Sequence, residues 1–230
     1  NVYEWCSDWY GDYPSGSVVD PIGARSGTDR VRRGGCWYSL ASYCRTAIRS
    51  ELTPDLRRSF LGFRLAHRPI LPDASPLTLD EGLATKVATA TPGISQPKEL
   101  VRDDSAADNE NTSIPAQSRD WTVDLGGGES IKMRWIAPGS FQMGSPSGES
   151  GRDDDERQHR VTLSEGYHLG ATEVTQGQWQ AVMGNNPSKF KGAGLPVEQV
   201  SWNDAMAFCR KLTERERAAS RLPAGMAYTL

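Results

Sequence analysis

Four cysteines have the greatest capacity for chemistry in this sequence, because a thiolate can bind a soft metal ion or take part in redox reactions. They are Cys6, Cys36, Cys44 and Cys209. They form no CxxC pair and no Cys/His cluster with zinc spacing, so a structural zinc ion is not expected. Four cysteines in 230 residues also fall short of a disulfide scaffold. From spacing alone, each is interpreted as a small buried side chain.

The other ionisable residues predict packing or surface roles. His159 and His168 lie beside expected strands, which favours packing over catalysis, and His67 lies at the edge of a polar segment. The acidic run at 153–156 could attract calcium, but it is interpreted as a solvated loop. Lysine plus arginine (26) nearly balance aspartate plus glutamate (29), for a net charge of −3. That balance argues against a nucleic-acid-binding protein.

Composition divides the chain into three regions. Residues 1–70 are rich in aromatics, glycine and arginine, whereas residues 71–117 contain no Trp, Tyr, Phe or Cys. The middle region cannot bury enough apolar surface to offset its ordering entropy, so it is predicted to be a disordered linker. Residues 118–230 return to aromatic and apolar patterning. No apolar run is long enough for a membrane span. Both ends are expected to be cut edges, which leaves the cellular compartment undetermined.

Strand patterns open the third region. Ile131, Met133 and Trp135 alternate with basic residues, which is the two-residue period of a strand. The APGS sequence at 137–140 predicts a turn, and the alternation resumes after it, so an antiparallel hairpin is expected. A second short strand pair is expected around the HRVTL and YHLGA sequences.

Two capping boxes predict the start of two helices. Thr175 with Gln178, and Ser201 with Asp204, can satisfy the free N–H groups of a first turn. Gly184 lies where a left-handed C-cap belongs. The apolar faces behind the two boxes are Trp179, Val182 and Met183, and then Ala205, Phe208, Cys209 and Leu212. Few helices, short strands and many turn glycines together predict an α+β fold that is low in regular secondary structure.

Several motifs in a fixed order resemble the formylglycine-generating-enzyme (sulfatase-modifying factor) family. NVYEWCSDWYG, RVRRGGCW, CRTAIRSELTPD and FLGFRLA are similar to its last third. MRWIAPGSFQMGS, HRVTLSEGYHLGATEVTQGQW and PVEQVSWNDAMAFCRKL are similar to its first half. The order is end-then-beginning, and the middle of the family is absent. The resemblance therefore implies the C-terminal portion of one domain at 1–70 and the N-terminal portion of a second, tandem domain at 118–230.

The resemblance also implies a fold. Family members have a C-type-lectin-like α+β fold whose first and last strands pair, and here it would be present as two incomplete pieces. In this chain the LGFRL segment (61–65) would then pair with the IKMRW segment (131–135) across the linker. That arrangement is expected to be a pseudo-permuted half-domain.

A copper chemistry follows from the same resemblance. Family enzymes oxidise a cysteine of a sulfatase to formylglycine, using Cu(I) held by two cysteines near the GG motif. Without a gap, Cys44 falls on the second copper cysteine, Ser39 replaces the first, and Cys36 falls on an active-site serine. Cys36 and Cys44 could form a displaced copper pair, or Cys44 could be a structural cysteine of the kind found in non-oxidase relatives. Serine is a poor Cu(I) ligand, so this chain is not expected to be competent in the family reaction.

Two further sites are implied by the family. Asn1, Val2 and Glu4 resemble one side of a calcium site, since they supply amide, backbone and carboxylate oxygens; alternatively, Glu4 pairs with a nearby arginine. Cys209 matches a family cysteine that is bridged to one just after the GFR motif. This sequence has leucine and alanine at that place, so the bridge is expected to be lost.

Three functional hypotheses follow. The first is an oxidase or related redox enzyme that acts on a cysteine of a protein or peptide substrate. The second is a non-catalytic lectin-like module that binds a ligand or a protein. The third is a truncated product without activity of its own. A Cys44→Ser substitution would separate the first two, because only an oxidase would lose copper and activity.

Overall fold

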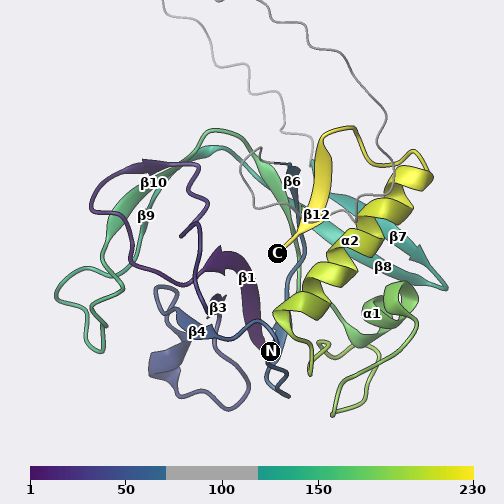
Figure 1. Cartoon of the computed structure of the whole chain (residues 1–230), viewed down its shortest axis with the longest axis horizontal. Coiled ribbons are helices and arrows are strands. Elements are labelled where there is room, and N and C mark those ends of the chain that lie inside the picture. The colour runs from purple at the N-terminus through teal and green to yellow at the C-terminus, as the bar shows by residue number, and fades with distance from the viewer. Residues whose placement is uncertain (71–118) are drawn as a thin grey trace, which may run out of the picture. The chain divides into compact units, whose positions relative to one another are not determined.

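The computed structural model describes residues 1–70 and 119–230, which belong to one compact unit (Figure 1). The predicted linker at 71–117 lies outside the described residues. The described residues form these elements: β1 (Tyr3–Trp9), β2 (Val18–Val19), β3 (Arg30–Arg33), η1 (Ala41–Cys44), β4 (Ser50–Leu52), β5 (Leu61–Phe63), β6 (Ala66–Pro69), β7 (Trp121–Gly126), β8 (Glu129–Ile136), β9 (Gly139–Met143), β10 (His159–Leu163), β11 (Tyr167–Gly170), α1 (Gln176–Met183), α2 (Trp202–Ala218) and β12 (Met226–Thr229).

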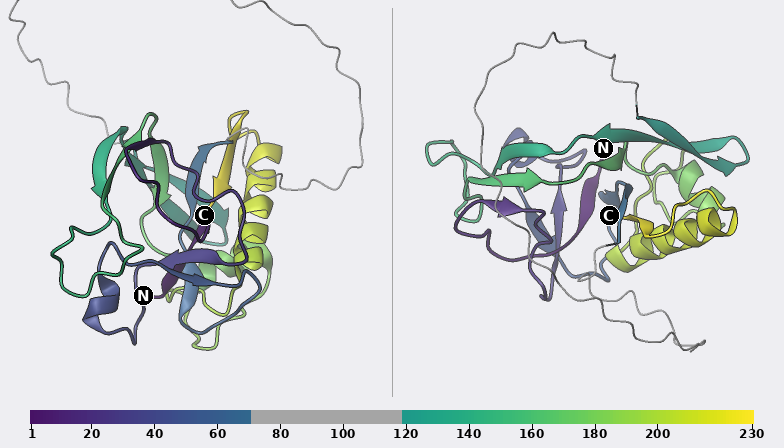
Figure 2. Two further views of the ribbon diagram at one scale, coloured as in Figure 1. Left: turned by 60° about the vertical axis from the view of Figure 1, so that its left-hand side comes forward. Right: turned by 90° about the horizontal axis from the view of Figure 1, so that it is seen from above.

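The described strands form three sheets. One contains strands of the N-terminal segment alone, in the order β4-β3-β1-β5, and its β1 and β5 are parallel. The other two sheets combine both segments, in the orders β2-β10-β9 and β12-β6-β11-β8-β7. Helix α2 contacts β12 and α1, and Figure 2 shows it running alongside the five-stranded sheet. These sheets and helices confirm the predicted α+β class.

The predicted strand at 131–135 is confirmed, but its predicted partner is wrong. Ile131 and Met133 are buried on β8, and the alternating basic residues Lys132 and Arg134 are exposed. Strand β8 pairs with β7 and β11, whereas β9 pairs with β10. Residues 129–143 (β8 and β9) thus run antiparallel to residues 159–170 (β10 and β11), and this two-stranded ribbon extends from the five-stranded sheet into the three-stranded one. Alternation specifies which face of a strand is buried, but it does not specify the partner strand.

The segment at 61–65 also has a different partner from the one expected. Strand β5 pairs with β1, and the following strand β6 enters the five-stranded sheet between β11 and β12. Strand β11 therefore separates β6 from β8, and the predicted direct pairing with residues 131–135 is wrong. The two segments nevertheless share this sheet. Their assignment to two successive domains stays a prediction.

Both predicted helix starts are confirmed. The Thr175 hydroxyl accepts from the Gln178 amide, and the Gln178 side chain accepts from the Thr175 amide at 2.9 Å. Ser201 and Asp204 make the equivalent reciprocal pair at 3.1 and 2.9 Å. Gly184 ends α1 with a φ of 87°, a left-handed conformation that glycine adopts without strain.

The hydrophobic core draws on both segments. Phe63 of β5 has no exposed surface and packs edge-on against Trp179 of α1 and Phe208 of α2, with ring centroids 6.0 and 5.4 Å away. The rings of Trp179 and Phe208 are stacked at 5.5 Å. Trp5 of β1 is buried and donates its indole N–H to the Val200 carbonyl at 3.1 Å.

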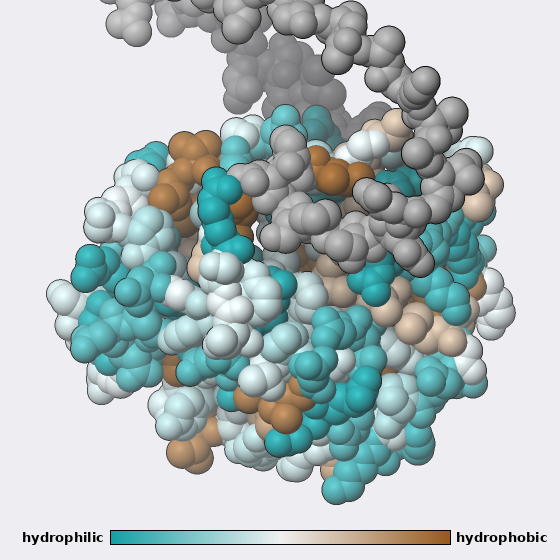
Figure 3. Space-filling model, in the orientation of Figure 1, coloured by the Kyte–Doolittle hydropathy of each residue, from teal (hydrophilic) through white to brown (hydrophobic). Residues whose placement is uncertain are grey.

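On the face drawn in Figure 3, hydrophobic residues gather in small separate groups among polar ones. Within the described ranges, neither helix combines the length and the apolar character that crossing a membrane requires.

Candidate functional site

The GG motif makes a tight turn after β3. Gly34 and Gly35 both have positive φ angles, 93° and 67°. A Cβ atom on Gly35 would lie 2.6 Å from the sulfur of Cys44, which is closer than the two atoms can approach. A glycine at position 35 is therefore required for Cys44 to pack against the backbone beside Cys36.

Cys36, Ser39 and Tyr3 form a connected set, which we call the serine–thiol site. The Cys36 sulfur is buried and lies 3.2 Å from the Ser39 hydroxyl oxygen, which also accepts from the Cys36 amide at 3.0 Å. The Ser39 hydroxyl donates to the Tyr3 phenol oxygen at 3.3 Å. Because a serine hydroxyl has one proton, the Cys36 thiol can then act as donor to Ser39. Ser39, which is predicted to replace the family's first copper cysteine, is thus held by two neighbours.

The four cysteines occupy different environments, and all four are free thiols. Cys209 is buried in the core, and burial raises the pKa of its thiol, which is the behaviour of a packing residue. Burial likewise raises the pKa of the Cys6 thiol to about 12. Cys44 is exposed at the end of η1, so the expectation that every cysteine is buried is wrong for this residue. Leu65 and Ala66 stand where the family's bridging partner of Cys209 is expected, so this chain has no cysteine at that place.

The two positions predicted to match the family's copper cysteines are not both thiols. They hold one thiol, Cys44, and one hydroxyl, Ser39. A hydroxyl oxygen is a hard ligand, whereas Cu(I) prefers soft sulfur. The Ser39 oxygen also already bonds to Cys36 and Tyr3. A displaced pair of Cys36 and Cys44 stays a prediction.

The residues that resemble a calcium site lie at the start of β1. Asn1 is exposed, and the Val2 amide donates to Glu173 at 3.3 Å. Glu4 forms an ion pair with Arg64 at 2.7 Å, which is the alternative role considered above, while its burial raises the pKa of its carboxyl. Among the described residues, no three Cys, His, Asp or Glu side chains gather closely enough to hold a metal ion. A calcium site at Asn1, Val2 and Glu4 stays a prediction.

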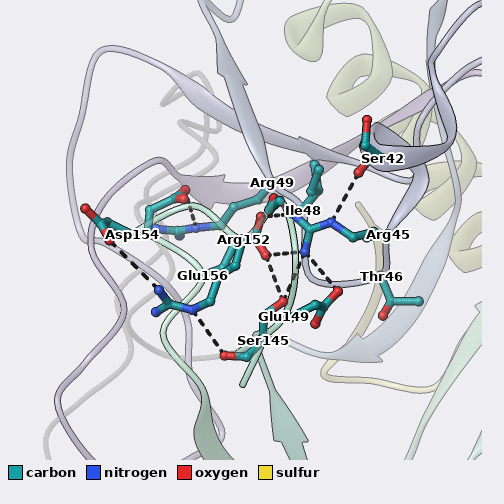
Figure 4. Close-up of polar contacts among 12 residues, drawn as sticks. Ser42, Arg45, Thr46, Ile48, Arg49, Ser145, Glu149, Arg152, Asp154 and Glu156 are labelled. Carbon is teal, nitrogen blue, oxygen red and sulfur yellow. Dashed lines mark hydrogen bonds and ion pairs between the residues drawn. The ribbon is translucent and has the colours of Figure 1, made fainter. Parts of the chain in front are cut away.

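An ion-pair network forms around Arg45, the residue that follows Cys44 in the sequence (Figure 4). The Arg45 guanidinium contacts both carboxylate oxygens of Glu156 at 2.7 Å and reaches Glu149 at 3.1 Å. Ser145 donates to Glu156 at 2.8 Å. Burial favours the neutral carboxyl of Glu156, yet these hydrogen bonds from Arg45 and Ser145 lower its pKa overall. The loop between β9 and β10 is thereby fastened to the residue that follows Cys44.

The sequence pattern did not predict that the acidic run at 153–156 takes part in this network. Glu156 is only 1% exposed, and Asp155 accepts from the Tyr10 hydroxyl at 2.6 Å and pairs with Arg49 at 3.3 Å. The interpretation of the run as a solvated loop is therefore wrong for its last two residues. Their partners are more than 100 residues away in the sequence, so local charge patterning could not have revealed them.

A row of aromatic rings extends from the serine–thiol site to the surface. We call Tyr3, Phe60, Tyr38, Trp37 and Phe190 the aromatic row. Successive ring centroids are 6.3, 5.1, 5.0 and 5.9 Å apart. Tyr3 is buried at one end, whereas Trp37, Tyr38 and Phe190 are each about half exposed. The Trp-Tyr pair directly after the glycine turn is the sequence signal that could have located this surface.

Comparison with known proteins gives a family match. A family model described as "Sulfatase-modifying factor enzyme 1-like domain" matches residues 1–69 and 128–229. The chain is 47% identical to the formylglycine-generating enzyme of Streptomyces coelicolor, over 29% of this chain and 23% of that protein. It is 52% identical to the chaperone protein LppX of Paenibacillus barcinonensis, over 24% of this chain and 20% of that protein. It is also 46% identical to the serine/threonine-protein kinase Pkn1 of Chlamydia trachomatis, over 29% of this chain and 11% of that protein.

The matches cover only part of each relative. The chain spans less than a quarter of the length of these three proteins. Among solved structures, Treponema denticola variable protein 1 aligns with a TM-score of 0.39 and 38% sequence identity, over 44% of this chain and 37% of that one.

Proposed function

Since the matching family model covers well over half of its residues, this chain belongs to the sulfatase-modifying factor enzyme 1-like family, and we propose that it is a non-catalytic, protein-binding member. Within this proposal the chain has the C-type-lectin-like fold of the family. Residues 1–70 and 118–230 are then parts of two successive domains.

The observation that carries the proposal is the state of Ser39. It occupies the position of the first copper cysteine, and its hydroxyl oxygen bonds to the Cys36 thiol and to Tyr3. The family reaction depends on two thiolates that hold Cu(I) at these positions, and this chain supplies one. No step of that oxidation can therefore be assigned to the side chains present.

A binding role is supported by the surface beside the same site. Trp37 and Tyr38 follow the glycine turn and expose 58% and 52% of their surface, although large aromatic side chains are usually buried. Trp and Tyr are the residues that contribute most to protein–protein binding energy, because they bury a large area at little cost in side-chain entropy. A rigid scaffold that presents such residues on loops is typical of recognition modules.

Titration with Cu(I) against a competing chelator tests the proposal on the reduced protein. The wild-type chain should bind no tighter than its Cys44→Ser variant. A Ser39→Cys variant restores the family pattern of two thiols, and we expect it to bind Cu(I) on the order of a hundredfold more tightly, a gain of about 2.8 kcal/mol. A wild-type chain that binds one Cu(I) tightly and loses it in Cys44→Ser would instead support the oxidase, with Cys36 and Cys44 as ligands.

A further inference from the structure

We propose that the aromatic row binds a peptide that presents an apolar or aromatic side chain flanked by carboxylates. This inference rests on the proposed binding function and names the class of partner. Three observations support it: the geometry of the rings, the two cations at the ends of the row, and a buried donor of one of these cations that has no partner among the described residues.

The rings are arranged edge-to-face along the exposed part of the row. The Trp37 ring makes interplanar angles of 73° with Tyr38 and 85° with Phe190, and Tyr38 makes 81° with Phe60. Each of these rings therefore meets its neighbour edge-on, and Trp37, Tyr38 and Phe190 are each about half exposed. An apolar side chain of a peptide can pack against two such rings at once.

A cation lies at each end of the row. The Arg32 guanidinium lies 4.1 Å from the Tyr3 ring centroid and 5.8 Å from that of Phe60, and Lys189 lies 5.5 Å from the Phe190 centroid. Neither side chain has a carboxylate partner within the described part of the chain.

The Arg32 guanidinium also has an unsatisfied donor, as do those of Arg30, Arg49 and Arg64. Its Nε donor is buried and has no hydrogen-bond partner among the described residues. A buried donor without an acceptor is unfavourable, because its hydration is lost and not replaced. Carboxylates on a bound peptide would neutralise both cations, and the inner carboxylate can approach the guanidinium of Arg32 as a charge-assisted acceptor.

The geometry favours a peptide over a nucleic acid. Bases stack on aromatic faces that lie open and flat, in a groove with a continuous positive charge. Here the edge of one ring covers the face of its neighbour, and the whole chain has a net charge of −3. A single apolar side chain with acidic neighbours matches both the exposed rings and the two separated cations.

Fluorescence anisotropy with a labelled synthetic peptide provides the test. The probe carries a central phenylalanine flanked on both sides by aspartates, and a matched probe carries lysines in place of the aspartates. We expect the wild-type chain to bind the acidic probe and not the basic one. Trp37→Ala should weaken binding by about tenfold or more, which is the usual effect of losing a central aromatic anchor. Lys189→Glu should weaken it less, and this effect should shrink as salt is added.

Phe141→Ala is the matched control variant, because Phe141 is an exposed aromatic residue (44%) outside the row, on β9. It should bind the acidic probe as the wild type does. Trp37 is exposed, so its variant should also keep the wild-type unfolding midpoint, which separates a binding defect from a folding defect.

Three outcomes would overturn the inference: no binding of the acidic probe by the wild type, equal binding by Trp37→Ala, or a preference for the basic probe. Binding of a single-stranded RNA probe in place of the peptide, lost in Trp37→Ala, would assign the row to nucleic acid. The Cu(I) titration is independent of these results. A chain that binds Cu(I) tightly and also binds the acidic probe would refute the non-catalytic function and leave this inference standing.

Discussion

Two of the contacts between the N-terminal segment (1–70) and the C-terminal segment (119–230) have opposite chemistry. The apolar contact consists of Trp5 and Phe63 against Trp179, Val200 and Phe208. The polar contact consists of Arg45 and Arg49 against Ser145, Glu149, Asp155 and Glu156. The first contact consists of buried apolar side chains, most of them aromatic, and the second consists mainly of ion pairs.

The two contacts therefore have different roles: one stabilises the fold, and the other positions a loop. Burial of apolar surface stabilises the fold by roughly 25 cal/mol for each Å² removed from water, with little dependence on direction. A buried ion pair contributes little net stability, because desolvation opposes the attraction, yet its geometry is directional. We infer that the apolar contact holds the two segments together, whereas the polar contact orients the loop at 144–158 beside Cys44.

Removal of the Phe63 ring should have the largest effect on this comparison. Phe63 is fully buried between Trp179 and Phe208, so Phe63→Ala should lower the free energy of unfolding by about 4 kcal/mol through lost contacts and a residual cavity. Denaturant titration measures the change, and the exposed Phe141→Ala variant is the control. A Phe63→Ala variant as stable as this control would contradict the role given to the apolar contact.

Loss of the Arg45 charge should have a smaller but distinctive effect. Arg45→Met leaves Glu156, 1% exposed, without its main partner, and should cost about 3 kcal/mol of unfolding free energy. The double variant Arg45→Met/Glu156→Leu removes both charges and should recover most of that loss. If the double variant were no more stable than the single one, the polar contact would stabilise the fold in its own right.

Lowering the pH should reduce the free energy of unfolding by a smaller amount, through protonation of His67 on β6. Burial of His67, followed by the charge of His168 on β11, lowers the pKa of His67 to about 4. The imidazole packs against Trp121 of β7 and Tyr228 of β12, and among the described residues neither of its nitrogens has a hydrogen-bond partner. This folded pKa lies below the unfolded value of about 6.5, so the unfolded chain binds the proton more tightly.

Stability should therefore be complete above about pH 6.5 and should fall by about 2 kcal/mol as the pH drops towards 4. Denaturant titrations across this pH range measure the loss. His67→Phe lacks the titrating group and should show a flatter profile. A wild-type profile no steeper than that of His67→Phe would show that His67 is not the responsible group.

The parts of the fold that the sequence predicts are those set by neighbouring residues. Two such features are the capping boxes at Thr175 and Ser201 and the alternation around Met133. Each involves side chains within four positions of one another, so each can be predicted from a single sequence. Strand β8 pairs with β7 and β11, and β9 pairs with β10. Alternation does not specify a partner strand, so the pattern alone gave the wrong pairing. Glu156 was misjudged because its partner Arg45 lies 111 positions away.

The candidate site shows the same limit. The motif spacing located Cys36, Ser39 and Cys44, and it predicted that a hydroxyl stands where the family has a copper-binding thiol. It could not show that Tyr3 bonds to Ser39, because the two are 36 positions apart. Nor could it place Phe190 beside Trp37, since these residues come from different segments.

The position of β6 has a consequence for how the molecule is made. This strand belongs to the N-terminal segment, but both of its neighbours, β11 and β12, lie in the C-terminal one. During synthesis, β6 leaves the ribosome roughly 100 residues before either partner, with unpaired hydrogen-bonding groups on both edges. Closing so long a loop is slow, because its entropy must be lost before the sheet forms. Nascent chains stalled between β6 and β11 should therefore be the species that chaperones bind and that aggregates.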